Sequence, residues 1–379
     1  MRAHEPGAHL AILGTRGIPA RYGGFETFAE ELAPRLAARG HDVWVYARRH
    51  GIGDTPRPIR GGLTEYRGVT VRVQRAPRGK HLETVAHSLL AASDAMRRRF
   101  DAVLVCNAAN FHVLPALRLS GTRTVVNVDG LEWRRRKWGG PGRLWHRAGA
   151  ALVTRWAGEL VADSRHVQQW WEDNRGRRPT YIPYGCPHGP LDSDAILGRL
   201  GLQRRGYVLY VARLEPENNA HLVIEAFRQV VSDSLLVIVG HAPYSTDYQQ
   251  RLCELAARDT RVVLAGPVYG TAYAELQSHA YCYVQASDVG GTHPALLEAL
   301  AYGGAVVVND IAEHLEVTGN AARVYRFNDA ASLTRRLQEL LDDPAAAEGL
   351  RKSARRHVGT HYRWDKVTDA YEDILLPQP

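Results

Sequence analysis

One stretch of the chain combines glycine, proline and a carboxylate in an order that suits ligand binding. Residues 287–300 read SDVGGTHPALLEAL. Adjacent glycines let a turn approach a ligand closely, and proline suits the first helical position because its φ is fixed and it has no N–H to pair. The first amides of a helix lack partners inside it and, with the helix dipole, attract anions. We therefore expect a loop that feeds a helix and binds phosphate or sugar hydroxyls at Gly290, Gly291, Thr292, His293, Pro294 and Ala295.

Two charged residues could complete this site. Glu298 would lie one turn inside the helix, where a carboxylate can accept hydrogen bonds from two ribose hydroxyls; an ordinary surface glutamate fits the spacing equally well. Arg213 follows the apolar run 207–212, and an arginine at the carboxyl end of a parallel strand can bind a diphosphate through its fork of donors. The alternative for Arg213 is an ion pair with Glu217 on the next helix.

The first half of the chain has a glycine-punctuated loop of its own. Residues 14–26 follow a short apolar run, 9–13, and precede a helix whose apolar side chains recur every three or four positions. The loop lacks the dinucleotide fingerprint and the P-loop lysine, but its amides can face a phosphate. Its candidate residues are Arg16, Gly17, Arg21, Gly23, Gly24 and Glu26.

Carboxylates also follow the apolar run 124–128. Asp129 and Glu132 stand just beyond the carboxyl end of a predicted strand, where parallel sheets bind ligands. The basic residues 134–137 lie between Trp133 and Trp138 and could meet phosphates or lipid headgroups; a solvated helical face is equally compatible.

Strand and helix patterns alternate along the whole chain, which indicates an α/β protein with parallel sheets. We expect two Rossmann-like domains that face each other across a cleft. Repeated breakers at residues 184–190 place the boundary there, so the domains span 1–185 and 186–362. A helix over 143–160, one over 333–341 and a last helix within 363–379, returning to the first domain, are among the predicted elements.

The composition narrows the class of protein. The chain has 379 residues, 45% hydrophobic and 23% charged, as in globular proteins, and we expect a cytoplasmic location because no apolar run could span a bilayer. Four scattered cysteines suggest neither a disulfide framework nor a metal site. Net charge is +14 over residues 1–185 and −6 over the rest, so the first half should face an anionic partner unless its charge merely aids solubility. No motif indicates nucleic-acid binding.

Several of these segments together resemble the retaining GT-B glycosyltransferases of family 4, and more closely a rhamnosyltransferase-like branch of that family. The resemblance covers nearly the whole chain. It depends on five separated matches in the same order: residues 14–19 (GTRGIP), 22–26 (YGGFE), 127–133 (NVDGLEW), 216–219 (PENN) and 289–292 (VGGT).

The resemblance implies roles for individual residues. Glu298 is similar to the second glutamate of the family's E-x7-E motif, Arg213 to its diphosphate arginine, and Pro267 and Val268 would bracket the base through main chain. Two positions depart from the family: its first glutamate falls at Gly290 and its lysine at Asn218, beside Asn219. Both departures are similar to those of the branch, and Arg16 and Arg21 are candidates for the missing positive charge.

The expected function is transfer of a hexose or deoxyhexose, with retention, from a nucleoside diphosphate sugar to an acceptor hydroxyl. Branch resemblance favours dTDP-L-rhamnose over UDP- or GDP-hexoses. Asp129 and Glu132 would contact donor sugar or acceptor. The acceptor is either a lipid-diphosphate-linked saccharide at the inner membrane face or a soluble glycoside. No metal or cofactor is expected, because Asp163, Asp192 and Asp194 suit caps or loops. The alternative is a catalytically idle nucleotide-sugar-binding protein.

Overall fold

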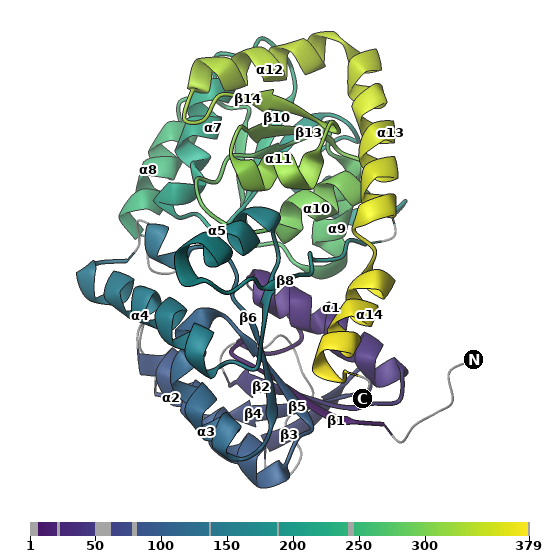
Figure 1. Ribbon diagram of the computed structural model, residues 1–379. Helices are drawn as coiled ribbons and strands as arrows, with labels where there is room; N and C mark the ends of the chain where they lie inside the picture. Colours follow the sequence, from purple (N-terminus) through teal and green to yellow (C-terminus); the bar gives the residue numbers. More distant parts are fainter. Residues whose placement is uncertain are drawn as a thin grey trace. The chain divides into compact units, whose positions relative to one another are not determined.

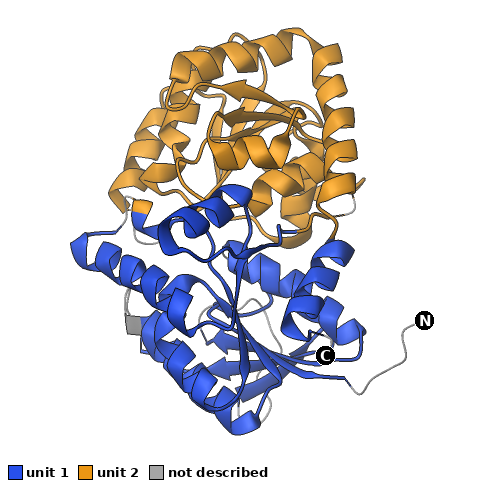
Figure 2. Cartoon of the chain, in the orientation of Figure 1, with its two compact units in different colours: residues 1–133, 138–184, 364–379 blue, residues 134–137, 185–363 orange. Residues whose placement is uncertain are grey.

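The computed structural model describes residues 7–20, 23–49, 62–77, 82–135, 138–187, 189–241 and 246–377 (Figure 1). The chain divides into two compact units (Figure 2). Unit 1 contains residues 1–133, 138–184 and 364–379, and unit 2 contains residues 134–137 and 185–363. The sequence-based boundary lies one residue away from this division. The short basic segment 134–137, which we had placed in the first domain, groups with unit 2.

Unit 1 is built on an eight-stranded sheet in the order β3-β4-β2-β1-β5-β6-β7-β8, in which only the β3–β4 pair is antiparallel. Its strands are β1 His9–Leu13, β2 Asp42–Arg48, β3 Leu63–Tyr66, β4 Val69–Gln74, β5 Ala102–Cys106, β6 Arg123–Asn127, β7 Glu159–Ala162 and β8 Thr180–Tyr181. Strand β3 was not predicted from the sequence, because it is a short edge strand that pairs on one side only and carries few apolar residues.

Helices of unit 1 connect these strands. They are α1 Gly24–Ala38, α2 Leu82–Arg98, η2 Ala108–Val113, α3 Leu114–Leu119, η3 Glu132–Arg134, α4 Gly140–Trp156, α5 Arg165–Arg175 and α14 Trp364–Leu375. The predicted helix over 143–160 was misplaced at both ends. Pro141 starts α4 earlier, and Ala157 adopts extended backbone, so β7 can begin at Glu159.

The last helix, α14, packs within unit 1. Tyr371 is fully buried and its hydroxyl accepts a hydrogen bond of 2.8 Å from Asn127 Nδ2, while its ring lies 5.1 Å from that of Phe28 on α1. Arg39 forms ion pairs with Asp369 and Glu372 of the helix. A segment that begins 180 positions after residue 184, the previous residue of unit 1, is thus held there by both apolar and charged contacts.

Unit 2 is built on a six-stranded, fully parallel sheet in the order β11-β10-β9-β12-β13-β14. Since β9 lies between β10 and β12, the direction in which strands are added reverses between β9 and β12. In open α/β sheets ligands bind outside the carboxyl ends of the strands at this reversal. The strands are β9 Tyr207–Val211, β10 Leu235–Val239, β11 Val262–Gly266, β12 Cys282–Gln285, β13 Ala305–Asn309 and β14 Ala322–Tyr325.

Alternate side chains of β9, β10, β12 and β13 form a core with α7, α8 and α12. The helices of unit 2 are α6 Ala195–Leu200, η4 Pro216–Asn218, α7 Ala220–Phe227, α8 Thr246–Ala256, α9 Gly270–His279, α10 Pro294–Ala301, α11 Ala312–Thr318, α12 Ala330–Asp342 and α13 Pro344–His361. Helix α13 was not predicted from the sequence, because its buried stripe includes the small residues Ala347 and Ala354 and the charged Arg351.

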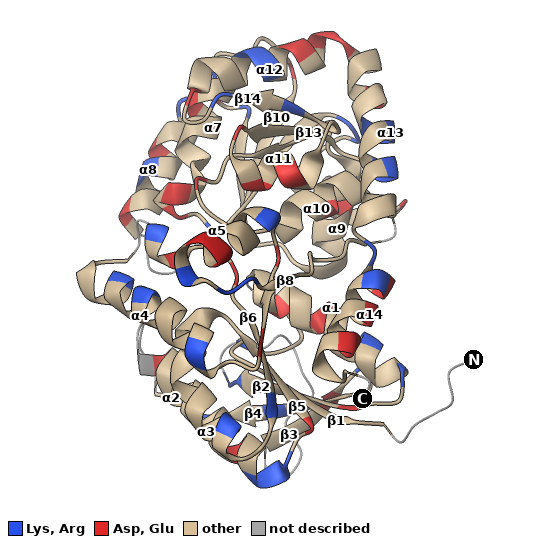
Figure 3. Cartoon of the chain, in the orientation of Figure 1, with Lys and Arg blue, Asp and Glu red and all other residues tan. Residues whose placement is uncertain are grey.

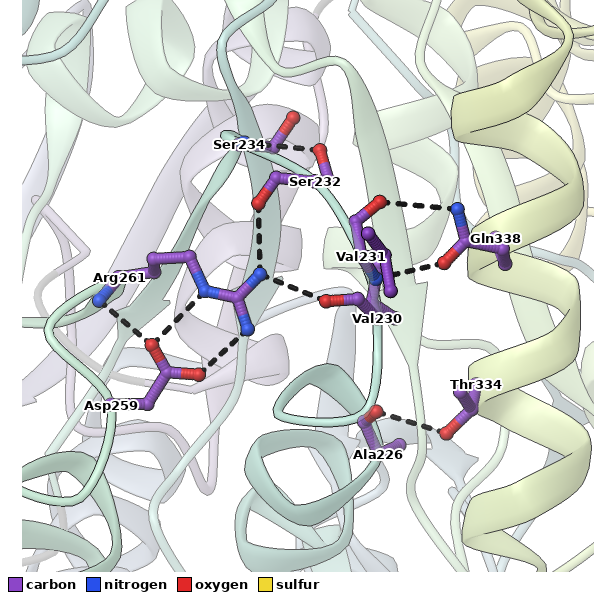
Figure 4. A network of polar contacts seen from close by, with 9 residues as sticks. All are labelled: Ala226, Val230, Val231, Ser232, Ser234, Asp259, Arg261, Thr334 and Gln338. Atoms are coloured by element: carbon purple, nitrogen blue, oxygen red, sulfur yellow. Dashed lines mark hydrogen bonds and ion pairs between the residues drawn. The ribbon is translucent and has the colours of Figure 1, made fainter.

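A polar network links the segments at the amino-terminal ends of β10 and β11 (Figure 4). Arg261 Nη1 donates to the carbonyls of Val230 and Ser232 at 2.9 and 2.8 Å, and its guanidinium pairs with Asp259. From α12, Gln338 hydrogen-bonds the backbone of Val231. The connection from α7 to β10 is therefore held on both sides, at the end of the sheet opposite to the loops that follow β9 and β12.

No helix within the described part of the chain combines the length and apolarity needed to cross a bilayer.

We predict that Tyr371→Phe lowers the free energy of unfolding by about 1–3 kcal/mol, because Asn127 loses a buried hydrogen-bond acceptor. Urea denaturation would measure the loss. Asp373→Asn, an exposed change in the same helix, should stay within about 0.5 kcal/mol of the wild type. A Tyr371→Phe variant as stable as the wild type would show that this contact contributes nothing to the docking of α14.

Candidate donor-binding site

The loops that follow β9 and β12 are tied to each other at the reversal of strand order in unit 2. Asn219 Nδ2 donates to the Ala286 carbonyl at 2.9 Å and to the Asp288 carboxylate. The backbone N–H of Asp288 donates to the Glu217 carbonyl at 2.8 Å. Asn219 has a φ of 59°, a left-handed conformation that asparagine tolerates better than most residues. The fold thus brings together two loops that are about 70 positions apart in sequence.

The glycine loop after β12 has a steric reason for glycine at position 290. A Cβ atom there would lie 2.4 Å from Nε2 of His293, far inside van der Waals contact. Gly290, Gly291 and Thr292 are buried, and His293 is half-buried. The imidazole therefore fills the space that a side chain at position 290 would need, which gives a physical account of the missing glutamate.

Helix α10 begins as expected, with Pro294 at its first position. His293 is the N-cap residue by backbone conformation, but its side chain makes no capping hydrogen bond. The amino-terminal end of α10 is thus not closed by its own N-cap side chain. It lies beside the tied loops, where an anionic group could receive its amide hydrogen bonds.

Glu298 is held by the neighbouring helix. It is half-buried, and its Oε2 accepts a hydrogen bond from the hydroxyl of Tyr273 on α9. Gln277 Nε2 donates to the same hydroxyl at 2.9 Å. Burial, and secondarily the Glu298 carboxylate, raise the pKa of Tyr273 well above its usual value, so the phenol remains a donor. Glu298 is therefore a half-buried carboxylate whose position is fixed by Tyr273.

The ion pair between Arg213 and Glu217 is absent. Glu217 is 1% exposed, and neither of its carboxylate oxygens has a hydrogen-bond partner. Arg213 lies half-buried just beyond β9, and its carbonyl accepts a 2.7 Å hydrogen bond from Asn218 Nδ2. Asn218 thus stabilises the turn after β9, while the Arg213 guanidinium lies close enough to His293 to affect its pKa.

A buried polar chain supports the glycine loop and was not found from the sequence. Asn309 Nδ2, at the end of β13, donates to the Ser287 carbonyl at 3.0 Å, and its Oδ1 accepts from His314 Nδ1. The His314 ring lies 4.9 Å from that of His293. A polar residue at the end of the apolar run 304–309 was the only signal for this chain.

Burial disfavours the protonated form of both histidines in the folded protein. Burial, and then the Arg135 and Arg213 guanidiniums, lower the pKa of His293 to about 3. Burial also holds the pKa of His314 well below its usual value. The loop is therefore supported by rings that carry no charge at neutral pH.

Two further donor-side candidates lie beyond β11. Pro267 is exposed and Val268 is half-buried, and both precede α9, which carries Tyr273. Among the described residues no group of three or more His, Cys, Asp and Glu side chains is arranged to hold a metal ion. Asp194 begins α6 and pairs with Arg204 at 2.8 Å.

In unit 1, the Glu26 side chain contacts the glycine loop at Arg16 and at Gly23. Its buried carboxylate accepts the Arg16 amide at 2.7 Å, and burial raises its pKa. Gly23, with a φ of 109°, lies against this carboxylate, since a Cβ would be 2.4 Å from Glu26 Oε2. Gly17 also has positive φ, and Gly24 is the first residue of α1. Arg21 lies outside the described residues.

Asp129 and Glu132 follow β6, as expected. The backbone N–H of Asp129 donates to Asn127 Oδ1 at 3.0 Å, and Asp129 adopts a left-handed φ of 55°. Glu132 is buried, and Trp138 Nε1 donates to its Oε2 at 3.4 Å. This loop is therefore anchored to the fully buried Asn127.

The structure describes the basic segment between the two tryptophans only in part. The rings of Trp133 and Trp138 pack against Trp170 and His146, at 4.8 and 4.7 Å. Arg135 is 8% exposed, and residues 136 and 137 lie outside the described residues. Both tryptophans thus pack within unit 1, and contact of the basic segment with phosphates or lipid headgroups stays a prediction.

Comparison with protein families finds one match in each half of the chain. Residues 194–357 match the family model of glycosyl transferases group 1, and residues 8–187 match a domain of unknown function, DUF1972. Residues 194–357, which lie within unit 2, are therefore similar to group 1 glycosyl transferases. The arginine, glycine loop and α10 described above all lie within the matched range.

Two curated relatives match parts of the chain. One is O-antigen chain mannosyltransferase B of Escherichia coli, 26% identical over 48% of this chain and 49% of the relative. The other is the GDP-mannose-dependent monoacylated alpha-(1-6)-phosphatidylinositol monomannoside mannosyltransferase of Corynebacterium glutamicum, 28% identical over 58% of this chain and 62% of the relative. The chain thus spans about half to three fifths of these relatives.

Among solved structures, sucrose-phosphate synthase from Thermosynechococcus elongatus is similar over 97% of this chain and 98% of that chain, with a TM-score of 0.81 and 18% identity. This similarity confirms the predicted GT-B fold with two Rossmann-like parallel-sheet domains.

We predict that Gly290→Ala lowers the free energy of unfolding by about 1–3 kcal/mol, because its methyl group would overlap the His293 ring. The loss should be at least halved when measured in a His293→Ala background, since that change makes room. Gly349→Ala in α13 is the matched control: a Cβ there meets nothing within 4 Å, so stability should be unchanged or rise by about 0.5–1 kcal/mol. Equal effects of Gly290→Ala in both backgrounds would exclude this packing.

Proposed function

We propose that the protein transfers a hexose or deoxyhexose from a nucleoside diphosphate sugar to an acceptor hydroxyl. The observation that carries the proposal is the junction at the strand-order reversal of unit 2, where Asn219 ties the Arg213 loop to the glycine loop ahead of α10. The leaving diphosphate gains negative charge in the transition state, and fixed donors that point at this charge lower the barrier. Arg213 and the amides of the glycine loop supply such donors.

The other donor-side residues extend this arrangement. Glu298, held by Tyr273, would accept hydrogen bonds from the ribose, and the backbone of Pro267 and Val268 would contact the base. In unit 1, Asp129 and Glu132 would contact the transferred sugar or the acceptor, and Arg16 would add positive charge. We further propose retention of configuration without a metal, as the family resemblance implies.

For the sugar, resemblance to the rhamnosyltransferase-like branch favours dTDP-L-rhamnose. The names of the two relatives point instead to mannose, in one case from GDP-mannose. Measuring the affinity of one protein preparation for each nucleotide and its nucleotide sugar would distinguish between these donors.

For the acceptor, we favour a lipid-linked saccharide at a membrane surface. Helix α4 carries Arg143, Arg147 and Arg155 and no acidic residue (Figure 3). Leu144 is 69% exposed and Trp145 37% exposed between the first two arginines. Exposed apolar side chains flanked by arginines suit an interface with anionic lipid headgroups. One relative is named for an acceptor built on phosphatidylinositol, while a soluble glycoside remains the alternative acceptor.

We predict that Arg213→Ala lowers kcat/KM about a hundredfold, by analogy with the removal of a single donor at other anionic transition states. The preferred dTDP, UDP or GDP ligand should stabilise the wild type by about 2.7 kcal/mol at a concentration of a hundred times its Kd, which a thermal-shift assay detects. Arg213→Ala should abolish this stabilisation. Arg258→Ala, an exposed arginine of unit 2, is the control. Nucleotide-sugar binding without transfer or hydrolysis would favour the idle binding protein, and the absence of any shift in the wild type would contradict the proposed function.

We predict that Arg143→Ala/Arg147→Ala weakens binding to vesicles containing phosphatidylserine by about 2 kcal/mol, roughly thirtyfold, since each cation near an anionic surface contributes about 1 kcal/mol. Vesicle sedimentation at low and high salt would measure the change. Arg199→Ala/Arg258→Ala removes the same charge from exposed positions of unit 2 and should leave binding unchanged. No vesicle binding by the wild type at low salt would support a soluble acceptor.

A further inference from the structure

The hydroxyl of Tyr273 is held on both sides where α9 meets α10. Gln277, one turn further along α9 and 1% exposed, donates from Nε2 to the phenol oxygen at 2.9 Å. The same Nε2 lies 3.4 Å from the Ala295 carbonyl of α10, so Gln277 is itself tied to the neighbouring helix. The phenol has one proton, which it donates to Oε2 of Glu298. The protein therefore sets the direction of this hydrogen bond before any ligand binds.

This hydrogen bond occupies one of the two oxygens of the Glu298 carboxylate. Burial, and secondarily the carboxylate itself, keep the pKa of Tyr273 well above its usual value, so the phenol stays a donor at neutral pH. A hydrogen bond to an ionised oxygen is stronger than one between neutral groups. A ligand hydroxyl that approaches Oε2 must therefore share this oxygen with the phenol or displace a strong bond.

The occupied oxygen affects the two hydroxyls of a ribose differently. Neighbouring hydroxyls pair best with a carboxylate when each has an oxygen of its own. With Oε2 engaged by Tyr273, the second hydroxyl gains little on binding, although it still loses its hydrogen bonds to water. A 2′-deoxyribose has no second hydroxyl and avoids this cost.

We propose that Tyr273, by occupying Oε2 of Glu298, makes the donor site accept 2′-deoxynucleoside diphosphates as readily as ribonucleoside diphosphates. This inference rests on the proposed function and specifies the nucleoside class within it. Tyr273 acts through Glu298 and is a positioning residue, with Gln277 holding its hydroxyl. Of the three candidate donors, dTDP-sugars have a deoxyribose, so the pairing of Tyr273 with Glu298 removes the advantage that UDP- and GDP-sugars would otherwise have.

Calorimetric titration of the full-length protein with base-matched pairs would test this role. The pairs are UDP and dUDP, GDP and dGDP, and 5-methyluridine diphosphate and dTDP. For the base that the wild type prefers, the two Kd values should agree within about twofold. Tyr273→Phe should raise the preference for the ribonucleotide about fivefold to tenfold, because Oε2 can then accept from the 2′-hydroxyl.

The ratio of the two Kd values is the informative quantity, since a general loss of structure weakens both members of a pair equally. Tyr281→Phe is the matched control. It removes a hydroxyl that donates to the Leu340 carbonyl at 2.6 Å, at the opposite end of β12, and should leave the ratio unchanged.

A wild type that prefers the ribonucleotide more than about fivefold would overturn the proposal, and so would an unchanged ratio in Tyr273→Phe. If Tyr273→Phe fails to fold, Glu298→Ala decides instead: it should weaken both members of the pair by the same factor, about tenfold. A larger loss for the ribonucleotide, or no loss for either member, would reject the role of Tyr273. A wild type that binds none of the six nucleotides would instead contradict the proposed function itself.

Discussion

The candidate site in unit 2 depends on the hydrogen bonds that Asn219 makes between two loops. A parallel sheet whose strand order reverses leaves a gap between the connections on either side, because the chain departs in opposite directions from the two central strands. Asn219 closes this gap at one point, with its amide on the Ala286 carbonyl and its backbone in a left-handed conformation. Arg213 lies on one side of this tie, and the glycine loop and α10 lie on the other.

Below this tie, the site is made rigid by polar groups that have little contact with solvent. Tyr283, Gln285 and Ser287 are linked by hydrogen bonds along and beyond β12, and Asn309 continues the chain to His314. Donors that are held before a ligand arrives need no reorganisation when charge develops on a leaving group. Buried atoms without a hydrogen-bond partner also occur here, among them the Glu217 carboxylate oxygens and Nε2 of His293 and His314.

The strong positive charge of the first half of the chain is only partly available to a partner. Arg39 is paired with the last helix, and Arg177 donates to the carbonyls of Thr154 and Ala157 at the end of α4. These arginines stabilise unit 1. The outward arginines of α4 are different, because they flank exposed apolar side chains, and this is why the membrane proposal now rests on α4.

The amino-acid sequence by itself determined the parallel α/β architecture, because buried parallel strands require continuous apolar runs that are visible without a structure. It also placed Gly290, Pro294 and Arg213 at the ends of strands and at a helix start, since glycine and proline have strong local preferences. These local preferences also explain why the loop-to-helix prediction around Pro294 agrees with the structure.

Only the tertiary structure decided which of these residues meet. The Arg213–Glu217 pair was plausible at helical spacing, yet Glu217 is buried without a partner and Arg213 lies near His293. The hydrogen bond of Asn219 to Ala286, that of Asn309 to Ser287, and the packing of Trp133 on Trp170 all join residues more than 20 positions apart in the chain. Such contacts depend on the order and register of strands, which are set by the packing of whole sheets and helices. They therefore cannot be predicted from any short segment of the sequence.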